Sequence, residues 1–169
     1  MENTKKKRII SLYVENQVGV LAKIAGLFSG KCYNLESLTV GTTEDPTVSR
    51  MTIITNSDDE TYEQIKKQLN RMVEVIKVLD FTQLSIVMQE IMFIKVKNCS
   101  SEDKAELFRI AQTFQAKVRD YGHDSVLLEF VHTTHKNTSI VEYLKAEVQS
   151  IEVVRGGSVA IEAVTMPRR

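Results

Sequence analysis

Hydrophobic and polar residues alternate strictly near the start of the chain. Over residues 8–14, Ile10, Leu12 and Val14 fall on one side of an extended strand, and the positions between them fall on the other. A period of two is typical of a strand that buries one face. The pattern therefore predicts a strand at 8–14.

The period then changes to that of a helix. Apolar residues of 20–31 recur at helical spacing, and Gly30 is placed to form the C-terminal cap of the predicted helix. Gly26 lies four positions earlier on the same turn spacing. We expect these two glycines to allow close packing of the helix.

A hairpin, a second helix and a fourth strand complete the first half. Residues 34–43 and 47–55 are rich in Val, Ile and Thr and flank a turn, which predicts a hairpin. The sequence Ser-Asp-Asp-Glu at 57–60 reads as a capping box that opens a helix with Ser57 as its N-cap. Residues 73–80 form a further strand. The predicted order is βαββαβ.

The second half repeats this order. Residues 90–98 echo 8–16, because each segment is a strand that ends in Asn. The other predicted elements are a helix at 105–114, strands at 117–121 and 125–133, a helix at 139–148, and strands at 151–155 and 159–164. Residues 81–89 lack strong periodicity and are the natural linker.

This layout predicts an α+β protein made of two tandem ferredoxin-like βαββαβ domains, at 1–82 and 83–169. Each domain would be an antiparallel four-stranded sheet with two helices on one face. Such a sheet leaves a bare face or an open edge, so we expect pairing with a second copy of the chain.

Composition narrows the function classes. Of the 169 residues, 43% are hydrophobic and 26% are charged, which suits packed cores beneath a polar surface. The formal net charge of zero argues against a nucleic-acid binder, and we expect the basic run at 5–8 to be a solvated end. No apolar run is long enough to cross a membrane. We expect cytoplasmic residence, or an organelle stroma or matrix if a transit peptide has been removed.

The cysteine and histidine residues carry little functional signal. Cys32 and Cys99 form no C-x-x-C pair, so we expect two reduced thiols. His132 and His135 lack a third candidate ligand, so we expect exposed loop positions and no metal site.

One stretch of the first half carries the most chemical information. Asn16 ends the first strand, Gly19 precedes the first helix, and Asn34 opens the second strand. An Asn amide both donates and accepts, as the carboxylate and ammonium of a free amino acid require. The first N–H groups of a helix have no internal partner and favour a carboxylate, and Gly19 leaves that backbone accessible. These residues suggest an amino-acid sensor.

Two further considerations bear on this site. The second half has no counterpart of Gly19, and the residues after Asn98 are acidic, which would repel a carboxylate. We therefore expect only the first half to bind a ligand. Taken alone, Asn16 and Asn34 are also consistent with simple loop caps, since Asn is common at strand ends.

The same stretch is similar to that of a known family. The chain resembles the regulatory small subunits of acetohydroxyacid synthase, also called acetolactate synthase, and its first domain resembles an ACT domain. The resemblance covers nearly the whole chain and is most specific over 8–55. The matching motifs are Glu15-Asn16, Gly19-Val20-Leu21, Gly26-Leu27-Phe28-Ser29, Tyr33 to Val40, Asp45-Pro46, Ser49-Arg50-Met51-Thr52 and Glu90-Ile91-Met92.

The resemblance implies a chain with no catalysis and no cofactor of its own. It implies activation of a catalytic large subunit that carries thiamine diphosphate, Mg and FAD. It also implies feedback inhibition by valine or another branched-chain amino acid, in the biosynthesis of valine, leucine and isoleucine. The family's effector site lies between the ACT domains of a homodimer. The matching positions here are Asn16, Gly19, Val20, Leu21, Asn34 and Leu35.

Two residues depart from the family's pattern. Cys32 stands where Gly is usual, and Val18 stands where Pro is common. Both lie beside the implied pocket, which leaves effector affinity and choice open. A free-standing ACT-type sensor or transcription regulator is the alternative function, although no helix-turn-helix segment is evident. A small enzyme is a third reading, which suffers from the lack of a convergent acid, base and nucleophile.

Overall fold

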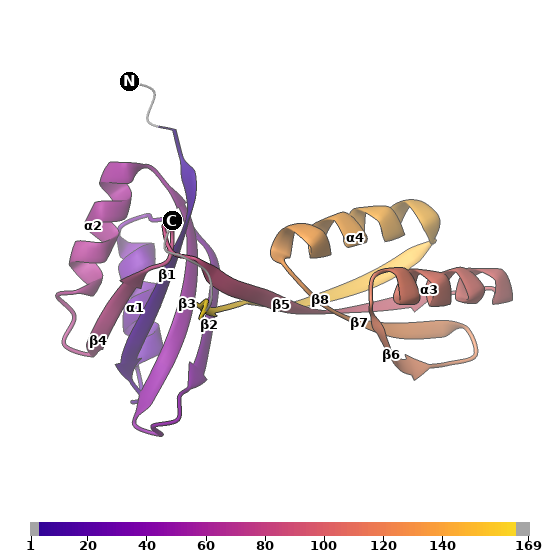
Figure 1. Ribbon diagram of the computed structural model, residues 1–169, viewed down its shortest axis with the longest axis horizontal. Helices are drawn as coiled ribbons and strands as arrows, with labels where there is room; N and C mark the ends of the chain where they lie inside the picture. Colours follow the sequence, from indigo (N-terminus) through magenta and orange to yellow (C-terminus); the bar gives the residue numbers. More distant parts are fainter. Residues whose placement is uncertain (1–3, 165–169) are drawn as a thin grey trace. The chain divides into compact units, whose positions relative to one another are not determined.

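The computed structural model describes residues 4–164, in which the βαββαβ order occurs twice (Figure 1). The first set is β1 (Lys6–Glu15), α1 (Val20–Gly30), β2 (Leu35–Thr42), β3 (Val48–Ser57), α2 (Asp59–Leu69) and β4 (Val75–Asp80). The second set is β5 (Ile86–Lys97), α3 (Ser101–Thr113), β6 (Lys117–Tyr121), β7 (Ser125–His132), α4 (Thr134–Glu147) and β8 (Ser150–Glu162).

The strands form two four-stranded sheets, in the orders β2-β3-β1-β4 and β6-β7-β5-β8. The pairing is antiparallel, with Lys6 opposite Ser57 and Glu15 opposite Val48 at the two ends of the β1–β3 ladder. The predicted α+β class and the two ferredoxin-like βαββαβ units are confirmed.

The chain divides into two compact units. One comprises the residues up to Val87 together with those from Ala160 onward, and the other comprises Met88–Val159. The domain boundaries at 1–82 and 83–169 stay a prediction. Strand β8 begins in the second unit, and its last residues belong to the first.

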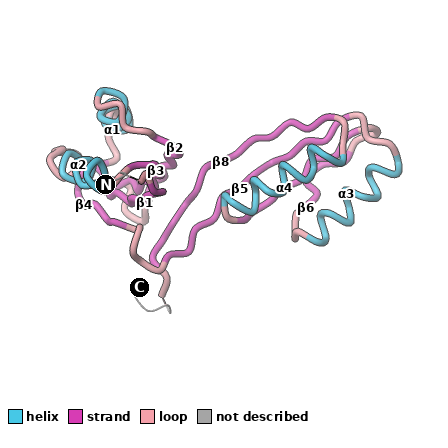
Figure 2. The backbone as a smooth tube through the Cα atoms, turned by 90° about the horizontal axis from the view of Figure 1, so that it is seen from above, coloured by secondary structure: helices cyan, strands magenta, loops and turns pink. Residues whose placement is uncertain are grey.

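Each unit buries its own apolar core between one sheet face and two helices. In the first unit, Ile10, Leu12 and Val14 are fully buried, as their alternation predicts. Helices α1 and α2 lie on the same side of this sheet (Figure 2). The second core is formed mainly by Met92, Ile94, Val96, Leu107, Ile110, Val126, Leu128, Phe130, Ile140 and Leu144.

The other face of the first sheet is covered by the end of β8. The Ala160 N–H donates to Thr52 Oγ1 at 3.4 Å, and the Arg50 guanidinium donates to Glu162 Oε2 at 2.9 Å. Ser11, on the same face, is fully buried. A face that the sequence leaves bare is therefore closed by the chain's own C-terminal part.

Two element predictions in the second half are wrong. Gly156 and Gly157 do not separate two strands, because β8 is continuous through them. A Cβ on Gly156 would lie 2.7 Å from Ile91 Cγ2, so this glycine makes room for a neighbouring side chain. Residues 81–89 are not a simple linker either: Phe81 is buried, and β5 begins at Ile86.

The glycine-based cap of α1 is also wrong. Cys32 has φ 54°, and its N–H donates to Ser29 O while that of Tyr33 donates to Phe28 O. These two hydrogen bonds form a Schellman motif in which the left-handed residue is Cys32. Gly30 lies inside the helix. An added Cβ at Gly26 or Gly30 would meet nothing within 4 Å, so neither glycine serves close packing.

The predicted capping box at 57–60 is wrong, because α2 is capped one residue later, at Asp58. The N-cap of α2 is Asp58, whose carboxylate accepts from the Thr61 N–H at 2.7 Å. Ser57 ends β3, and its buried hydroxyl has no hydrogen-bond partner. The strand therefore extends further than its β-branched residues indicate and takes Ser57 away from the helix.

Replacing Asp58 by Ala is expected to lower the free energy of unfolding by about 1 kcal/mol, because an N–H at the start of α2 loses its acceptor. Ser57→Ala is the matched control and should be neutral or slightly stabilising, since its hydroxyl makes no hydrogen bond. Urea unfolding of both variants measures the difference. A larger loss in the Ser57 variant would contradict this cap assignment.

The left-handed conformation of Cys32 predicts a stabilising substitution. Cys32→Gly should raise the free energy of unfolding by about 0.5–1 kcal/mol, because glycine adopts positive φ without a Cβ clash. Cys32→Ala keeps the Cβ and serves as the control. Thermal unfolding under reducing conditions should place the Gly variant above both other proteins; equal midpoints for Gly and Ala would count against strain at this residue.

Candidate effector site

Asn16 lies directly after β1 and is held in one orientation. Its Nδ2 donates to the Pro46 carbonyl at 2.9 Å, and its Oδ1 accepts from Ser49 Oγ at 3.0 Å. Its backbone N–H donates to Thr47 O at 2.7 Å. The side chain is nevertheless exposed. One amide hydrogen and one lone pair of Asn16 therefore remain for a ligand.

The start of α1 differs from the starts of the other described helices. Its N-cap is Gly19, with φ 90° and no side-chain cap. Asp58, Ser100 and Thr133 each accept a backbone N–H at the starts of α2, α3 and α4. Among residues 4–164, α1 is thus the helix whose positive end no side chain caps.

Gly19 also keeps the approach to this helix open. A Cβ built on it would meet nothing within 4 Å. Its positive φ is a conformation that residues with side chains rarely adopt. A carboxylate placed here would meet the first N–H groups of α1 without displacing any part of the chain.

Asn34 lies at the other end of the sheet. Its carbonyl accepts from the hydroxyl of Thr55, whereas Asn16 contacts Ser49. Ser49 and Thr55 belong to the same strand, β3, and their Cα atoms are about 20 Å apart at the rise of an extended chain. A single chain therefore does not bring Asn16 and Asn34 together around one amino acid.

The apolar candidates divide by exposure. Val20 is buried in the core of the first unit, and its backbone N–H donates to Gln17 O at 3.3 Å, so neither its side chain nor this N–H is left for a ligand. Leu21 is 44% exposed beside Gly19, and Leu35 is half-buried at the start of β2. Val18 projects fully into solvent. Leu21 thus remains available for an aliphatic ligand, and Leu35, which packs partly against the core, offers the remainder of its surface.

The second unit blocks the corresponding position with its own carboxylate. Asp103 accepts from the Ser100 N–H and hydroxyl, both at 2.8 Å, in a capping box at the start of α3. These hydrogen bonds lower the pKa of the Asp103 carboxyl. An occupied helix start supports the expectation that only the first half binds a ligand.

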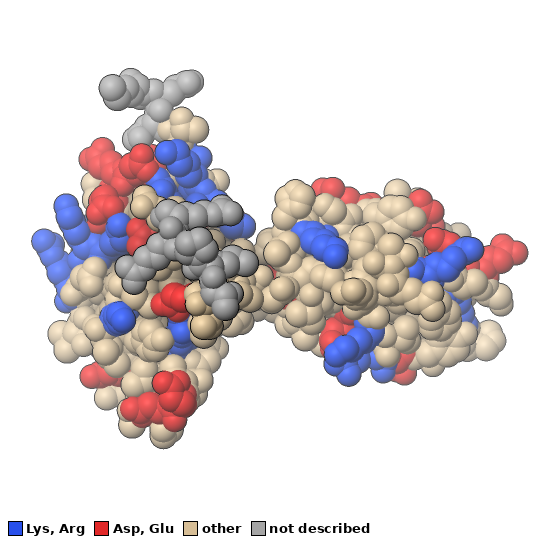
Figure 3. All heavy atoms as spheres, viewed as in Figure 1, with Lys and Arg blue, Asp and Glu red and all other residues tan. Residues whose placement is uncertain are grey.

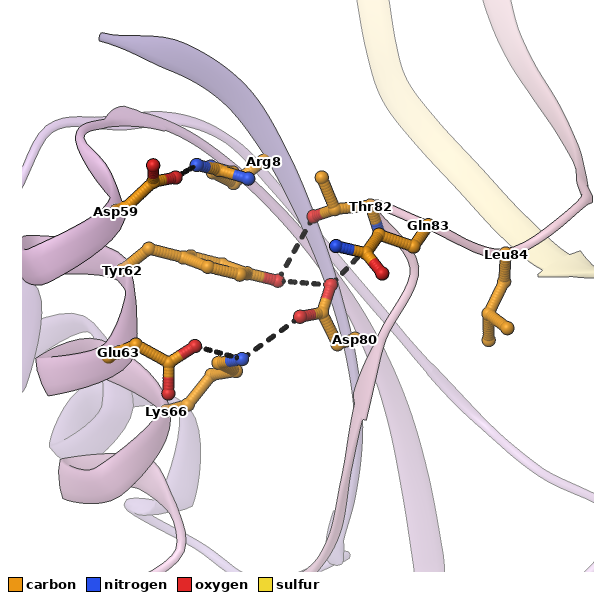
Figure 4. Close-up of a pocket in the computed structure, with 9 residues that line it drawn as sticks. All are labelled: Arg8, Asp59, Tyr62, Glu63, Lys66, Asp80, Thr82, Gln83 and Leu84. Atoms are coloured by element: carbon orange, nitrogen blue, oxygen red, sulfur yellow. Dashed lines mark hydrogen bonds and ion pairs between the residues drawn. The ribbon is translucent and has the colours of Figure 1, made fainter. Parts of the chain in front are cut away.

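Sequence reasoning did not find the polar cavity between α2 and the end of β4 (Figure 4). Its volume is about 560 Å³. The lining residues are Arg8, Asp59, Tyr62, Glu63, Lys66, Asp80, Thr82, Gln83 and Leu84. The charged side chains pair with one another, Arg8 with Asp59 and Lys66 with both Glu63 and Asp80. Arg8 is buried, so its predicted place in a solvated end is wrong.

Asp80 is the centre of this network. It accepts from the Tyr62 hydroxyl at 2.6 Å, the Thr82 N–H at 2.9 Å and Lys66 Nζ at 3.0 Å. Burial raises the pKa of the Asp80 carboxyl, but the hydrogen bonds from Tyr62, Thr82 and Lys66 outweigh it, so the pKa lies below its ordinary value. Burial and the bond to Asp80 raise the pKa of Tyr62. A network satisfied in this way fastens α2 to β4.

Comparison with known proteins identifies the family. The chain is 37% identical over 155 residues to the acetolactate synthase small subunit of Haemophilus influenzae, which covers 92% of this chain and 94% of that protein. It is 39% identical over 163 residues to that of Bacillus subtilis, covering 96% and 94%. The chain belongs to the acetolactate synthase small-subunit family. Family models described as "AHAS small subunit-like ACT domain" and "Small subunit of acetolactate synthase" match residues 10–77 and 89–164.

A crystal structure from this family has the same fold. The acetolactate synthase small subunit of Thermotoga maritima superimposes with a TM-score of 0.85 at 32% identity, covering 95% of this chain and 99% of that one. The resemblance inferred from the sequence motifs is therefore confirmed, as is the ACT domain in the first half. The family is regulatory, so the prediction of a non-catalytic chain is confirmed as well.

The remaining candidates do not form a second chemical site. His132 ends β7 with its Nε2 2.6 Å from Phe114 O, and His135 lies in α4, so the expected loop positions are wrong. Within residues 4–164, no three His, Cys, Asp or Glu side chains are grouped as metal ligands would be. Cys32 and Cys99 are free thiols.

Charge and hydropathy complete the description of the surface. Lys and Arg are interspersed with Asp and Glu on the face shown in Figure 3. Such mixing is unlike the continuous basic stripe of nucleic-acid binders. None of the helices between residues 4 and 164 combines the length and apolar character needed to cross a bilayer.

The lowered pKa of Asp80 predicts a stability change in acid. A carboxyl whose pKa is lower in the folded than in the unfolded state stabilises the fold at pH values above its unfolded-state pKa, which is near 4. This stabilisation is lost as the pH falls through the folded-state pKa. Asp80→Asn should lower the free energy of unfolding by about 1–2 kcal/mol at pH 7. The difference in the free energy of unfolding between this variant and the wild type should become smaller below about pH 4.

Urea unfolding between pH 2 and 7 measures this difference. Tyr62→Phe removes one donor to Asp80, so an NMR titration of that variant should show the Asp80 pKa shifted upward. A stability difference that stays constant across the whole pH range would contradict the proposed linkage.

Proposed function

We propose that this chain is the regulatory subunit of acetolactate synthase. In this role it activates a catalytic large subunit that carries thiamine diphosphate, Mg and FAD, and it transmits feedback inhibition by a branched-chain amino acid. Family membership supports the partner, and the uncapped start of α1 beside Asn16 supports the ligand. Residence in the cytoplasm, or in an organelle stroma or matrix, stays a prediction.

The effector site is proposed to lie between two chains of a homodimer. Strand β2 is an edge of the first sheet. Its start is level with Thr55 and its end, Thr42, is level with Ser49 on β3. Antiparallel pairing of β2 with its copy would therefore bring Asn34 of one chain to the end of the sheet where Asn16 of the other chain lies.

This geometry assigns a role to each site residue. The carboxylate of the amino acid meets the N–H groups after Gly19, and the two Asn side chains complete the polar contacts. Leu21 and Leu35 offer apolar surface to a branched aliphatic side chain. One methylene changes binding by only about 1–3 kcal/mol, so valine is the first choice, with leucine and isoleucine close behind.

A ligand that bridges two chains stabilises whichever dimer geometry fits it. Its influence on the enzyme is limited to its differential affinity for the two geometries, on the order of 1–3 kcal/mol for typical effectors. The catalytic subunit would respond to that geometry with lower turnover. No catalytic group on this chain is needed.

Substitutions in the α1 start should separate feedback from activation. Gly19→Asp places an anion and a strained Cβ where the effector carboxylate binds, and Asn16→Ala removes a donor and an acceptor. Each should weaken valine binding by roughly tenfold to a hundredfold while the small subunit still activates the enzyme. Asn70→Ala, at an exposed Asn that caps α2, is the control. Calorimetry and assays of the reconstituted enzyme measure both properties, and a fully valine-sensitive Gly19→Asp enzyme would contradict the placement.

Mixed dimers test whether the site is shared. Asn16→Ala and Asn34→Ala should each weaken both sites of a homodimer by roughly tenfold to a hundredfold. In a dimer of one chain of each kind, one site retains both asparagines, so half the wild-type binding capacity should return. Differently tagged chains allow its purification. If no binding capacity returned, the two residues would belong to a site within one chain or to no site at all.

Copurification tests the partner. Failure of the chain to copurify with a thiamine-diphosphate synthase would favour a free-standing sensor.

A further inference from the structure

The effector loop, residues 16–19, follows β1 and contacts the start of β3. One side chain joins these two strands on the face of the sheet opposite the helices. Strand β1 ends immediately before Asn16, and β3 supplies Ser49, which holds the Asn16 amide. The residue after Ser49 is Arg50. Since successive residues of a strand point to opposite faces, Arg50 lies behind the residue that orients Asn16.

Arg50 makes contacts with β1 along this face. Its Nε donates to Ser11 Oγ at 2.9 Å, and its guanidinium carbon lies 4.9 Å from the centre of the Tyr13 ring. It also lies 5.7 Å from the centre of the Phe81 ring. The guanidinium is largely buried, with 19% of the side chain exposed. A buried arginine of this kind is a rigid fork rather than a mobile surface charge.

The remaining partner of Arg50 comes from the end of β8. Arg50 Nη2 donates to Glu162 Oε2 at 2.9 Å. The backbone on both sides of Glu162 is also fixed: Ala160 N–H donates to Thr52 Oγ1, and Ala163 N–H donates to Ser85 O at 2.9 Å. These contacts all lie within the first unit, whereas β8 begins in the second.

We infer that Arg50 and Glu162 are positioning residues that tie the effector loop to β8. A movement of the β1 and β3 ends around Asn16 displaces Arg50, and the ion pair carries that displacement to the C-terminal end of β8. Strand β8 is continuous, so its C-terminal end in the first unit is connected directly to its N-terminal part in the second unit. This inference rests on the proposed function. It adds the route by which the effect of ligand binding is transmitted out of the ACT domain.

The test uses Glu162→Gln in the full chain, reconstituted with the catalytic subunit. This variant keeps the size of the side chain and removes its charge. Effector affinity should stay within about threefold of wild type and activation should be retained. The ratio of uninhibited to inhibited rate at saturating valine should fall by at least about fivefold, the lower end of typical allosteric coupling.

Glu152→Gln is the matched control. It makes the same change on the same strand, in an exposed ion pair with Lys97 at 2.7 Å, and should leave inhibition unchanged. Hydrogen exchange supplies a readout that a purely structural role would not move. Valine should slow amide exchange over residues 150–162 in the wild-type complex and in the control, and this response should be absent in Glu162→Gln.

The outcomes separate this inference from the proposed function. Full valine inhibition in Glu162→Gln would overturn the positioning role while leaving the effector site in place. Joint loss of activation and inhibition would also overturn it, because the ion pair would then only support the fold. A wild-type chain that neither binds a branched-chain amino acid nor activates the synthase would refute the proposed function itself.

Discussion

Antiparallel pairing of β1 and β2 with β3 places Asn16 and Asn34 at opposite ends of one sheet. The separation follows from the rise of an extended strand, about 3.3 Å per residue, and a side chain cannot span it. A site that uses both amides must therefore take them from different chains. The proposed dimerisation through the β2 edge would supply that arrangement and would also pair an edge that otherwise presents free N–H and C=O groups.

The two halves of the chain share one fold but differ at the start of their first helix. At the start of α1 a glycine leaves the helix N-terminus open, whereas at the start of α3 Ser100 and Asp103 close it with a capping box. In the proposed site, a bound carboxylate would meet at the start of α1 the electrostatic demand that the chain's own Asp103 meets at the start of α3. The proposed ligand binding thus depends on the absence of a side-chain cap at the start of α1.

Much of this architecture is predictable from the sequence. Alternation in β1 and helical spacing in α1 identify elements whose packing follows from their period, and the Asn–Gly loop identifies the candidate site. The missed features depend on tertiary contacts. Gly156 lies between two predicted strands but accommodates Ile91, and Cys32 takes the left-handed position that was predicted for Gly30. Neither role has a local signal in the sequence.

The polar networks were the hardest part to foresee. Arg8 and Asp59, Tyr62 and Asp80, and Arg50 and Glu162 are each far apart in sequence, and no periodicity joins them. The distance between Asn16 and Asn34 along the sheet likewise follows only from the strand register. That register supports the proposed site completed by a second chain, and linkage between ligand binding and dimerisation tests this proposal most directly. Sedimentation equilibrium of the chain with and without saturating valine should show a dimer dissociation constant that falls severalfold when the ligand is present; a constant unchanged by a ligand that binds would contradict a site shared between chains.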